Sequence, residues 1–535
     1  MCGIAIAIDW DDAAATTARL VEGILHRGDV TDPVVCPFPR IAMGTRRLQI
    51  VDGAHAIQPQ PSFDGRLLVA FNGEIYNHVE LRRELEAMGV VFRTASDTEV
   101  LASALRVWGP KALERLNGMY AFVAVDTANG EFVAVRDPLG VKPLYLIQSE
   151  RGFLFCSEIR PLLRACEKGD VLLLPPGHLL TRKTLHKFGS FVMQTAARIS
   201  GHDPAALDAI LEKAVRIRTP SDLPVSILFS GGVDSTLIAH YARRERPDIP
   251  GYFLGDDASP DYEYAARYAD QTSMDLRRVA LAEPNETLSA QIDEVVFAAE
   301  TFEPLVVRNG LCNFLLARRI HEDGCRVALS GEGADELFAG YEPIEIAFQH
   351  DEAAGGQVRE QTLAIMHKTN LQRLDRLGMR CQVEVREPYL DPAVIGYALS
   401  LPANALFQTT AGETHGKAPL RSLWDLYPDQ LPPAIRDRAK TPMNVGAGLD
   451  KSQKRSPWFE FAEQTVSDRD FAEGKRRFAR FDLSTKEEFL YLERLAATLD
   501  VSRVPYLTAR PYLKMPPMKL TPAAIDILDD YLVTT

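Results

Sequence analysis

The sequence predicts an α/β protein of two domains, and two observations support this class. In the first part of the chain, continuous apolar runs such as 4–8 are typical of strands covered on both faces, which favours layers of sheet and helix. After about residue 200, apolar strands alternate with helical segments, and this order predicts a parallel sheet with right-handed crossovers. We therefore expect domains at 1–190 and 205–535, joined by a polar linker near 185–205.

The first domain is expected to contain short strands and at least one surface helix. Residues 78–88 carry apolar side chains at helical spacing, and Gly89 follows as a candidate C-cap. The apolar runs predict strands at 4–8, 67–71, 121–125 and 132–135.

The second domain is expected to begin with a helix at 207–218. The predicted strands lie at 224–229, 251–254, 275–281 and 326–329. One predicted helix starts at Ser235, and three others cover 262–269, 286–300 and 309–322. Residues 350–535 are expected to be mostly helical. Ligands of parallel sheets bind at the carboxyl ends of strands, and two glycine-rich loops fall there.

Composition and charge exclude several classes of protein. With 46% hydrophobic and 25% charged residues, the chain is neither disordered nor collagen-like. Its net charge of −13 argues against general binding to nucleic acids or anionic membranes. Seven scattered cysteines without a CxxC pair indicate a reduced cytoplasmic protein, and no zinc-ligand spacing is present. No membrane helix or signal peptide is expected, which leaves Cys2 at the start of the folded chain.

Cys2 is a candidate nucleophile because removal of Met1 would give one residue both a thiol and a free α-amino group. That amino group can act as a general base near neutral pH. Alone, Cys2 would be interpreted as an ordinary cysteine, but the segments that follow supply side chains that could bind and activate a substrate. An asparagine amide and a glycine N–H suit an oxyanion hole, and an arginine with acidic residues suits a free amino acid.

The first half resembles the class II glutamine amidotransferases in the segments MCGI, HRG, RRLQIVD, FNGEIYN, SDTEV and RDPLGVKPLY. The resemblance implies an αββα sandwich of the Ntn type, with Cys2 as the nucleophile and Asn72 and Gly73 as the oxyanion hole. One departure is visible, since the family's HRGPD reads HRGDV here. By resemblance, the glutamine-binding residues are Arg47, Leu48, Gln49, Ile50, Val51, Asn72, Gly73, Glu74 and Asp97.

The loop SGGVDS at 230–235 lies between a predicted strand and a helix, where backbone N–H groups and the helix N-terminus can hold an anion. It is not a Walker A loop. It resembles the loop of the ATP pyrophosphatases, and SGEGADELFAGY at 330–341 narrows the resemblance to the asparagine synthetase family. The segments EVREPYLD, KAPLR and STKEEFLYL extend this resemblance over nearly the whole chain.

This resemblance implies a doubly wound ATP-pyrophosphatase domain with a helical extension, which uses ATP and Mg²⁺. Asp234 and Asp335 would hold Mg²⁺, and Glu332 and Lys417 would act at the acyl-adenylate. The ATP-binding residues implied by resemblance are Leu228, Ser230, Gly231, Gly232, Asp234, Ser235, Leu254, Ser330 and Gly331.

The two motif sets are chemically complementary, because amide synthesis needs both an activated acyl group and unprotonated ammonia. An internal ammonia supply avoids protonation and loss in water. We expect ATP, a carboxylic acid and glutamine to give an amide, AMP, pyrophosphate and glutamate. By resemblance aspartate is the favoured acceptor, the product is asparagine, and a homodimer is a family expectation.

One segment leaves the identity of the acceptor acid open. The family commonly reads ETYDVTTIR ahead of SGEG, whereas residues 300–308 read ETFEPLVVR. Arg308 is kept, but Leu305 and Val306 replace both threonines. If Leu305 and Arg308 line the acceptor site, the acceptor could instead be a less polar acid from a specialised pathway.

Three other functions fit the sequence less well. A member that makes an intramolecular amide, like β-lactam synthetase or a lasso-peptide cyclase, usually lacks a working N-terminal cysteine. Another alternative is a pyrophosphatase-loop enzyme that acts on tRNA or a nucleotide. The acidic charge and the lack of a basic nucleic-acid-binding module argue against tRNA. A non-enzymatic interaction protein would not need Cys2, Asn72, Asp97, Asp234 and Asp335 together.

Overall fold

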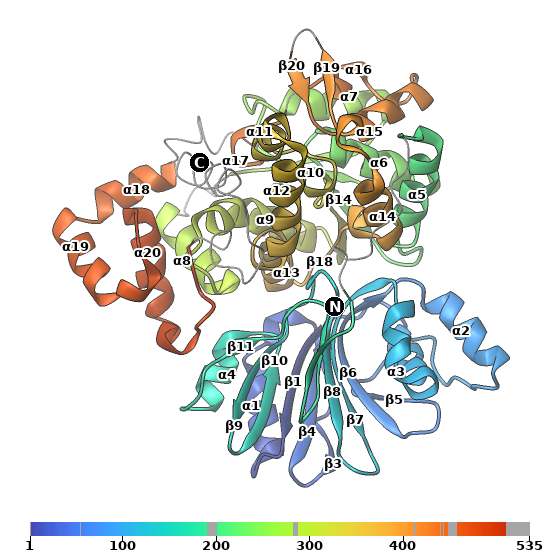
Figure 1. Cartoon of the computed structure of the whole chain (residues 1–535), viewed down its shortest axis with the longest axis vertical. Coiled ribbons are helices and arrows are strands. Elements are labelled where there is room, and N and C mark those ends of the chain that lie inside the picture. Colours follow the sequence, from blue (N-terminus) through green and yellow to red (C-terminus); the bar gives the residue numbers. More distant parts are fainter. Residues whose placement is uncertain are drawn as a thin grey trace. The chain divides into compact units, whose positions relative to one another are not determined.

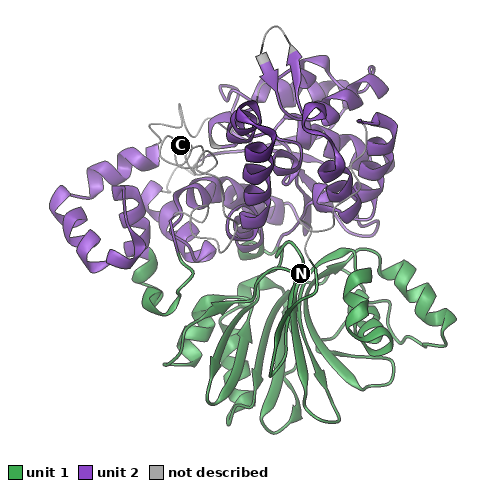
Figure 2. Ribbon diagram, viewed as in Figure 1, with its two compact units in different colours: residues 1–190, 379–382, 495–507 green, residues 191–378, 383–494, 508–535 purple. Residues whose placement is uncertain are grey.

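A computed structural model describes residues 2–53, 55–189, 201–281, 287–410, 413–438, 440–441, 443–447 and 457–509 (Figure 1). The chain forms two compact units, each assembled from separate stretches (Figure 2). Unit 1 comprises Met1–Ser190, Met379–Gln382 and Leu495–Leu507, and unit 2 comprises the remainder. The predicted linker 185–205 overlaps a short strand, β13 (Leu185–Lys187), and its residues 190–200 lie outside the described part.

Unit 1 contains two antiparallel sheets in its described residues. The first has the order β11-β9-β10-β1-β4-β2, with β3 also paired to β4. Its strands are β1 (Cys2–Ile8), β2 (Val30–Thr31), β3 (Val35–Phe38), β4 (Ile41–Arg47), β9 (Tyr145–Ser149), β10 (Gly152–Cys156) and β11 (Leu172–Leu173). The second, ordered β13-β12-β8-β7-β6-β5, adds β5 (Gln60–Pro61), β6 (Leu67–Ile75), β7 (Gly118–Asp126), β8 (Phe132–Arg136) and β12 (His178–Leu180).

The two sheets of unit 1 pack face to face and are covered on their outer faces by helices. One core lies between the sheets and joins Ile4, Ile6 and Met43 to Ala121 and Val123. A second core lies between the β6–β7 sheet and the helices α2 (His78–Ala87) and α3 (Asp97–Trp108). The helices α1 (Ala13–Glu22) and α4 (Ile159–Ala165) lie on the other side (Figure 1). This layering confirms the predicted α/β class, because β1 is buried on both faces.

Unit 2 is built on a parallel sheet with the strand order β16-β15-β14-β17-β18. All four strand pairs are parallel, as the alternation of strands and helices predicts. The strands are β14 (Val225–Leu228), β15 (Gly251–Leu254), β16 (Leu276–Val279), β17 (Val327–Leu329) and β18 (Glu384–Arg386). Strand β18 was not predicted, because its three residues EVR include two charged side chains that show no apolar run.

The five helices of unit 2 that lie before and between its strands agree with the predicted positions, but four of them begin at other residues than predicted. The helix predicted at 207–218 begins at Pro204, and the one predicted at 286–300 begins at Leu288. The helix predicted from Ser235 begins at Val233, and the helix predicted at 309–322 begins at Pro304. The earlier start of the second helix has a local cause, because Glu303 Oε2 accepts a hydrogen bond from Val306 N at 2.5 Å and Pro304 occupies the first turn. The helices are α5 (Pro204–Arg216), α6 (Val233–Glu245), α7 (Tyr262–Thr272), α8 (Leu288–Ala299) and α9 (Pro304–Glu322).

Beyond β17 the described chain is mostly helical, as predicted. One hairpin interrupts it, made of β19 (Gln408–Thr410) and β20 (Glu413–His415). No helix of the described residues is long and apolar enough to cross a membrane. The main helices are α10 (Ala334–Leu337), α11 (Glu342–His350), α12 (Glu352–Ile365), α13 (Asn370–Arg380), α14 (Pro392–Ser400), α15 (Ala418–Arg421), α16 (Pro433–Arg436), α17 (Met443–Gly446), α18 (Pro457–Thr465), α19 (Asp468–Arg477) and α20 (Lys486–Ala496).

Candidate functional site

The thiol of Cys2 lies buried at the first residue of β1, with only 5% of the residue exposed. Its backbone N–H donates a hydrogen bond to Asn72 Oδ1 at 3.1 Å, which joins the start of β1 to β6 in the facing sheet. Gln58 Nε2 lies 3.8 Å from Cys2 Sγ and is also buried. Gln58 was not predicted from the sequence. Burial raises the pKa of the Cys2 thiol to about 11, so the thiol is neutral in this environment.

Asn72 and Gly73 follow one another on β6, where the sequence predicts an oxyanion hole. Asn72 is fully buried, and its Nδ2 has no hydrogen-bond partner among the described residues. A buried amide donor without a partner is a candidate for binding an oxygen of a ligand. Gly73 permits the close approach of β7, because a Cβ there would lie 2.1 Å from the carbonyl oxygen of Met119. The structure thus brings Cys2, Asn72 and Gly73 together.

Arg47 lies on β4 directly opposite Cys2 in the sheet register. Its guanidinium forms a two-pronged ion pair with Asp32, with Nε to Oδ2 at 2.9 Å and Nη2 to Oδ1 at 3.1 Å. Its Nη1 donates to the carbonyl oxygen of Gly53 at 2.6 Å. Asp32, which fixes this arginine, was not predicted from the sequence. Arg47 is therefore held beside Cys2 by charge and geometry before any ligand binds.

The rest of the predicted glutamine-binding set surrounds this arginine and the end of β6. In the segment after β4, Gln49 N donates to Asp29 Oδ1 at 3.3 Å. Asp97 begins α3, and its Oδ2 accepts a hydrogen bond from Ile75 N at 3.0 Å. Glu74 and Asp97 are each only 5% exposed. Leu48 and Ile50 are buried, and Val51 is half-buried.

The second candidate site lies at the switch point of the parallel sheet of unit 2. The chain runs from β14 outward to β15 and β16, and then returns to the other side of β14 to form β17 and β18. The two glycine-rich loops follow β14 and β17, the strands on either side of this reversal. Ligands of doubly wound sheets bind in the crevice at this point. A cavity of about 330 Å³ lies here and is lined by Leu228, Ser230, Asp234, Ser235, Leu254, Leu305, Arg308, Ser330, Gly331, Glu332 and Asp335, among others.

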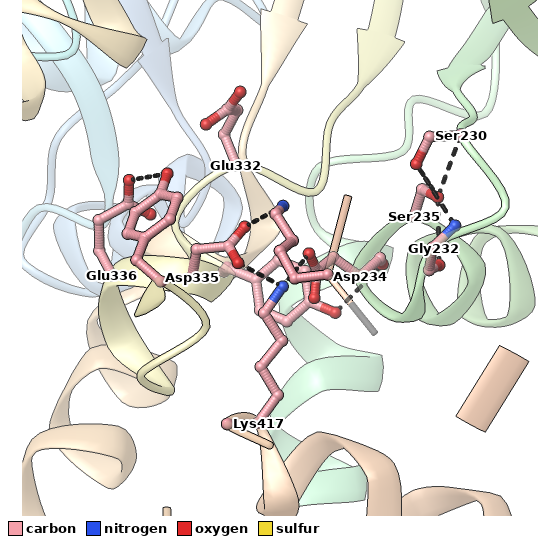
Figure 3. Close-up of polar contacts among 12 residues, drawn as sticks. Ser230, Gly232, Asp234, Ser235, Glu332, Asp335, Glu336 and Lys417 are labelled. Carbon is pink, nitrogen blue, oxygen red and sulfur yellow. Dashed lines mark hydrogen bonds and ion pairs between the residues drawn. The ribbon is translucent and has the colours of Figure 1, made fainter. Parts of the chain in front are cut away.

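The loop after β14 is closed by its two serines. Ser230 N donates to Ser235 Oγ at 3.2 Å, and Ser235 Oγ donates to the carbonyl oxygen of Gly232 at 3.3 Å (Figure 3). Gly231 has φ +68°, a conformation that favours glycine, and a Cβ there would lie 2.5 Å from Ala265 N. Gly232 is the N-cap of α6, so the loop ends at a helix N-terminus that can attract an anion.

Lys417 joins the two predicted metal ligands. Its Nζ lies 2.5 Å from Asp234 Oδ2 and 2.6 Å from Asp335 Oδ1, and Figure 3 shows its side chain reaching Asp234. Lys440, which was not predicted from the sequence, lies with its Nζ 2.7 Å from Asp335 Oδ2. Burial would raise the pKa of Asp335, but Lys417 and Lys440 outweigh it and lower the pKa to about 2. For Asp234, burial prevails and raises its pKa against the pull of Lys417.

The backbone holds Lys417 in an unusual conformation. Its φ is +64°, in the left-handed region that costs a non-glycine residue of order 1 kcal/mol or more. Lys417 N donates to the carbonyl oxygen of Phe338 at 2.8 Å, which ties it to the loop after β17. This contact fixes the lysine next to the segment that carries Asp335.

Glu332 and Glu336 form a second acidic pair at the cavity. Asn370 Nδ2 donates to Glu332 Oε2 at 2.9 Å and to Glu336 Oε1 at 2.8 Å, while Arg373 pairs with Glu332 Oε1. Tyr341 donates its hydroxyl hydrogen to Glu336 Oε1 at 2.8 Å (Figure 3). Burial, with the neighbouring Glu332 and Asp335, raises the pKa of Glu336 to about 8. Of these residues, the sequence analysis identified only Glu332.

The first turns of α9 supply one wall of the cavity. Leu305 lines it, as does Asn309 one turn further along, whose buried Oδ1 has no partner among the described residues. Arg308 also lines the cavity, but its Nε donates to Glu487 Oε1 of α20 at 2.8 Å and its Nη2 pairs with Glu487 Oε2. The arginine predicted to bind the acceptor is thus held by a buried carboxylate.

The missed residues carry no local signal in the sequence. Lys440, Asn370 and Arg373 lie in segments that have no glycine-rich loop and no strand ahead of them. Glu487 lies in STKEEFLYL, a segment that resembles the family but implies no role for this glutamate. Only the spatial arrangement identifies these side chains as partners of the predicted ones.

Comparisons with known proteins match both halves of the chain. A family model described as glutamine amidotransferase domain matches residues 1–174, and one described as asparagine synthase matches 206–365 and 348–504. Glutamine-hydrolysing asparagine synthetase 3 of Arabidopsis thaliana is 31% identical over 84% of this chain and 79% of its own. The asparagine synthetase of Triphysaria versicolor is 29% identical over 92% of this chain and 85% of its own.

Similarity to solved structures is much lower. The glutamine phosphoribosylpyrophosphate amidotransferase of B. subtilis has a TM-score of 0.30 and 17% identity, covering 62% of this chain and 81% of that one. A likeness of this size adds nothing to the fold described above.

Proposed function

Because the chain belongs to the asparagine synthase family, we propose that it is a glutamine-dependent synthetase that converts aspartate to asparagine and cleaves ATP to AMP and pyrophosphate. One observation carries the proposal. At the switch point of the parallel sheet, Lys417 joins two carboxylates that follow the two glycine-rich loops. A site of this kind suits a phosphate ligand, and the buried thiol of unit 1 supplies the matching glutaminase.

In the glutaminase half, Cys2 Sγ would attack the side-chain amide of glutamine and form a thioester, with ammonia as the leaving group. Asn72 Nδ2 and Gly73 N would donate to the oxyanion that forms at the carbonyl. Removal of Met1 would leave the α-amino group of Cys2 near Asn72 Oδ1, which accepts from the same nitrogen at 3.1 Å. That amino group would take the thiol proton, which a thiol with a pKa of about 11 does not lose unaided near neutral pH.

In the synthetase half, the N–H groups of the SGGVDS loop and the N-terminus of α6 would hold phosphate oxygens of ATP. The acceptor carboxylate would attack the α-phosphorus and release pyrophosphate, which leaves an acyl-adenylate. Lys417 would then exchange its contacts with Asp234 and Asp335 for contacts with phosphate oxygens and stabilise the developing charge.

Asp234 and Asp335 fit a role in holding Mg²⁺. Asp234 Oδ1 is buried without a hydrogen-bond partner among the described residues, and both carboxylates contact the same ammonium nitrogen. Mg²⁺ is usually bound by one or two carboxylates together with substrate phosphates. The ion would neutralise charge on the departing pyrophosphate.

The wall of the cavity formed by the first turns of α9 favours a second candidate function within the same reaction class. Leu305 lines the cavity where family members commonly have a threonine, so the acceptor could be a different carboxylic acid. Aspartate remains the first proposal because the relatives reported above are asparagine synthetases.

The test is pyrophosphate release with ATP, Mg²⁺ and glutamine, measured with and without aspartate, and mass spectrometry of the products. Asparagine formed together with pyrophosphate and AMP would support the first proposal. Glutamine hydrolysis without aspartate-dependent pyrophosphate would contradict aspartate as the acceptor. The same assay on a panel of carboxylic acids would then test the second candidate.

A further inference from the structure

The buried side chain of Gln58 reaches the sulfur of the proposed nucleophile. Gln58 lies in the segment between β4 and β5 and is only 3% exposed. Its Nε2 lies 3.8 Å from Cys2 Sγ, which is within the longer range of a hydrogen bond to sulfur. The thiolate is the reactive form of a cysteine, so a buried N–H group beside this sulfur can act on the charge that makes it a nucleophile.

The orientation of the Gln58 amide follows from its other contact. Gln58 Oε1 accepts a hydrogen bond from Phe71 N at 2.7 Å. A backbone N–H is only a donor, so the end of the amide that faces Phe71 has to be the oxygen. The end that faces Cys2 Sγ is therefore the NH₂ group. Phe71 directly precedes Asn72 on β6, so one strand sets both side-chain amides that lie beside Cys2.

The backbone of Gln58 is fixed as well. Gln58 N donates to Asp32 Oδ2 at 3.1 Å, and the carbonyl oxygen of Gln58 accepts from Thr45 Oγ1 at 3.4 Å. Asp32 is the same carboxylate that holds Arg47. A rotation of the Gln58 amide away from the sulfur would break its bond to Phe71 N. The donor is therefore in place before any substrate binds, as an efficient electrostatic stabiliser has to be.

The charged groups around Cys2 leave room for such a neutral donor. Burial raises the pKa of the Cys2 thiol to about 11, while Arg47 lowers this pKa and Asp32 raises it. Arg47 is already engaged by Asp32 in a two-pronged ion pair. A negative charge that develops on the buried sulfur is unfavourable unless N–H groups stabilise it.

Resting on the proposed function, we propose that Gln58 is a further catalytic residue of the glutaminase, whose Nε2–H group donates to Cys2 Sγ and stabilises the thiolate. The α-amino group takes the thiol proton, and the sulfur forms a C–S bond with the amide carbon of glutamine. The C–N bond breaks, and the nitrogen leaves as ammonia with the proton that the amino group returns.

The same hydrogen bond would assist the second half of the reaction. Water adds to the thioester, and the C–S bond breaks with its electron pair on sulfur. The water supplies its hydroxyl group to glutamate and its proton, through the amino group, to sulfur. The thiolate that Gln58 stabilises is thus the nucleophile of the first half and the leaving group of the second.

The experiment uses the full-length protein and variants that separate the two ends of the Gln58 amide. Gln58→Glu keeps an oxygen for Phe71 N but replaces the donor at the sulfur by an acceptor, and Gln58→Met removes both contacts without adding a charge. The control is Gln60→Met, which removes a neighbouring buried amide whose Nε2 donates to Thr94 Oγ1 at 3.0 Å. Melting temperatures check that the three variants fold.

Glutamine hydrolysis and alkylation of Cys2 are measured in parallel. Both Gln58 variants should lower kcat for glutamine hydrolysis about 10–100-fold, as loss of a donor to a charged group does, with KM for glutamine within about threefold. Alkylation of Cys2 by iodoacetamide at about pH 8, followed by mass spectrometry of the N-terminal peptide, should slow about tenfold or more, because its rate follows the thiolate fraction. Gln60→Met should stay within about threefold in both measurements.

Three results would overturn the inference. The first is full activity of Gln58→Glu, which would leave only the contact with Phe71 as important. The second is a raised KM for glutamine with unchanged kcat and alkylation rate, which would assign Gln58 to substrate binding. The third is an equal loss in Gln60→Met, which would assign the effect to folding of the segment.

Failure of the proposed function would look different. If the unmodified protein does not hydrolyse glutamine, the alkylation rates still compare the thiolate of Cys2 among the variants. Slower alkylation in both Gln58 variants, with Gln60→Met unchanged, would support the hydrogen bond to the thiolate while contradicting the glutaminase reaction. Equal alkylation rates in all four proteins would overturn the inference itself.

Discussion

Around Cys2 the groups that contact the thiol and its backbone nitrogen are neutral amides, from Gln58 and Asn72. Around the cavity of unit 2, carboxylates and cations face one another, and most of these charges are paired. The first arrangement suits the neutral side-chain amide of glutamine, because Asn72 Nδ2 is a buried donor that has no partner among the described residues. The second must exchange internal ion pairs for contacts with ATP. We infer that the glutaminase is preorganised and that the synthetase is organised by its ligands.

The two regions also differ in how they are assembled from the chain. Cys2, Arg47 and Asn72 are brought together by strand register in two sheets of one unit. Lys417 is 183 residues from its partner Asp234. A change in the first region should therefore affect one step, whereas a change in the second should disturb several groups at once.

The largest expected effect is a loss of glutamine hydrolysis that leaves ammonium-dependent synthesis intact. Cys2→Ala removes the proposed nucleophile, so glutamine hydrolysis should fall by about 10³-fold or more. Synthesis with added ammonium chloride should stay within about twofold, because the charged cavity is untouched. Glutamate formation and pyrophosphate release are measured in parallel, with Cys36→Ala as the exposed control. Glutaminase activity that survives in Cys2→Ala would contradict the assignment.

The next prediction tests whether the side-chain amide of Asn72 donates to the oxyanion. Asn72→Ala should lower kcat for glutamine hydrolysis by about 10²–10³-fold, as removal of one oxyanion donor does. Asn77→Ala is the control in the same segment, since its amide donates to the carbonyl oxygen of Arg115. Steady-state glutaminase assays check both variants. Equal losses in the two variants would indicate a folding defect in place of a lost donor.

The third prediction concerns Lys417 at the charged cavity of unit 2. Lys417→Met leaves Asp234 and Asp335 facing each other without their shared cation, and we expect synthesis to fall by about 10²-fold. Glutamine hydrolysis should be retained. Lys475→Met, at an exposed lysine of α19, is the control. Pyrophosphate release with ammonium chloride measures the loss, and full activity of Lys417→Met would remove the lysine from the mechanism.

The smallest effect concerns the pH dependence of unit 2. Burial raises the pKa of Glu303, the N-cap of α9, from 4.5 to about 7. Because the folded protein favours the neutral form, ionisation of this carboxyl weakens the folded state as pH rises from about 4.5 to about 7. Glu303→Gln lacks that penalty and should gain about 1–3 kcal/mol relative to the unmodified protein at pH 8, but not at pH 4. Chemical denaturation at both pH values measures the difference, and an equal difference at both would contradict the shift.

The sequence predicted the α/β class and the strands whose apolar runs are continuous, such as 4–8 and 251–254. It also predicted the loops whose glycines permit close approach, because glycine and small polar residues mark such loops directly. It did not reveal β18 or the early start of α9, which depend on a neighbouring strand and on one capping side chain. It missed Asp32, Lys440 and Asn370 for a related reason. Their partners lie far away in the chain, and nothing in their own segments marks them.

The buried pair between Arg308 and Glu487 has a practical consequence for redesign. Arg308 belongs to α9, yet the orientation of its guanidinium is set by the carboxylate of Glu487 on α20, 179 residues later in the chain. Tyr491 of the same helix donates to that carboxylate at 2.7 Å. An exchange of acceptor preference between relatives would therefore have to transplant α9 and α20 as one module, since either helix alone would carry an arginine or a glutamate into the interior without its counterpart.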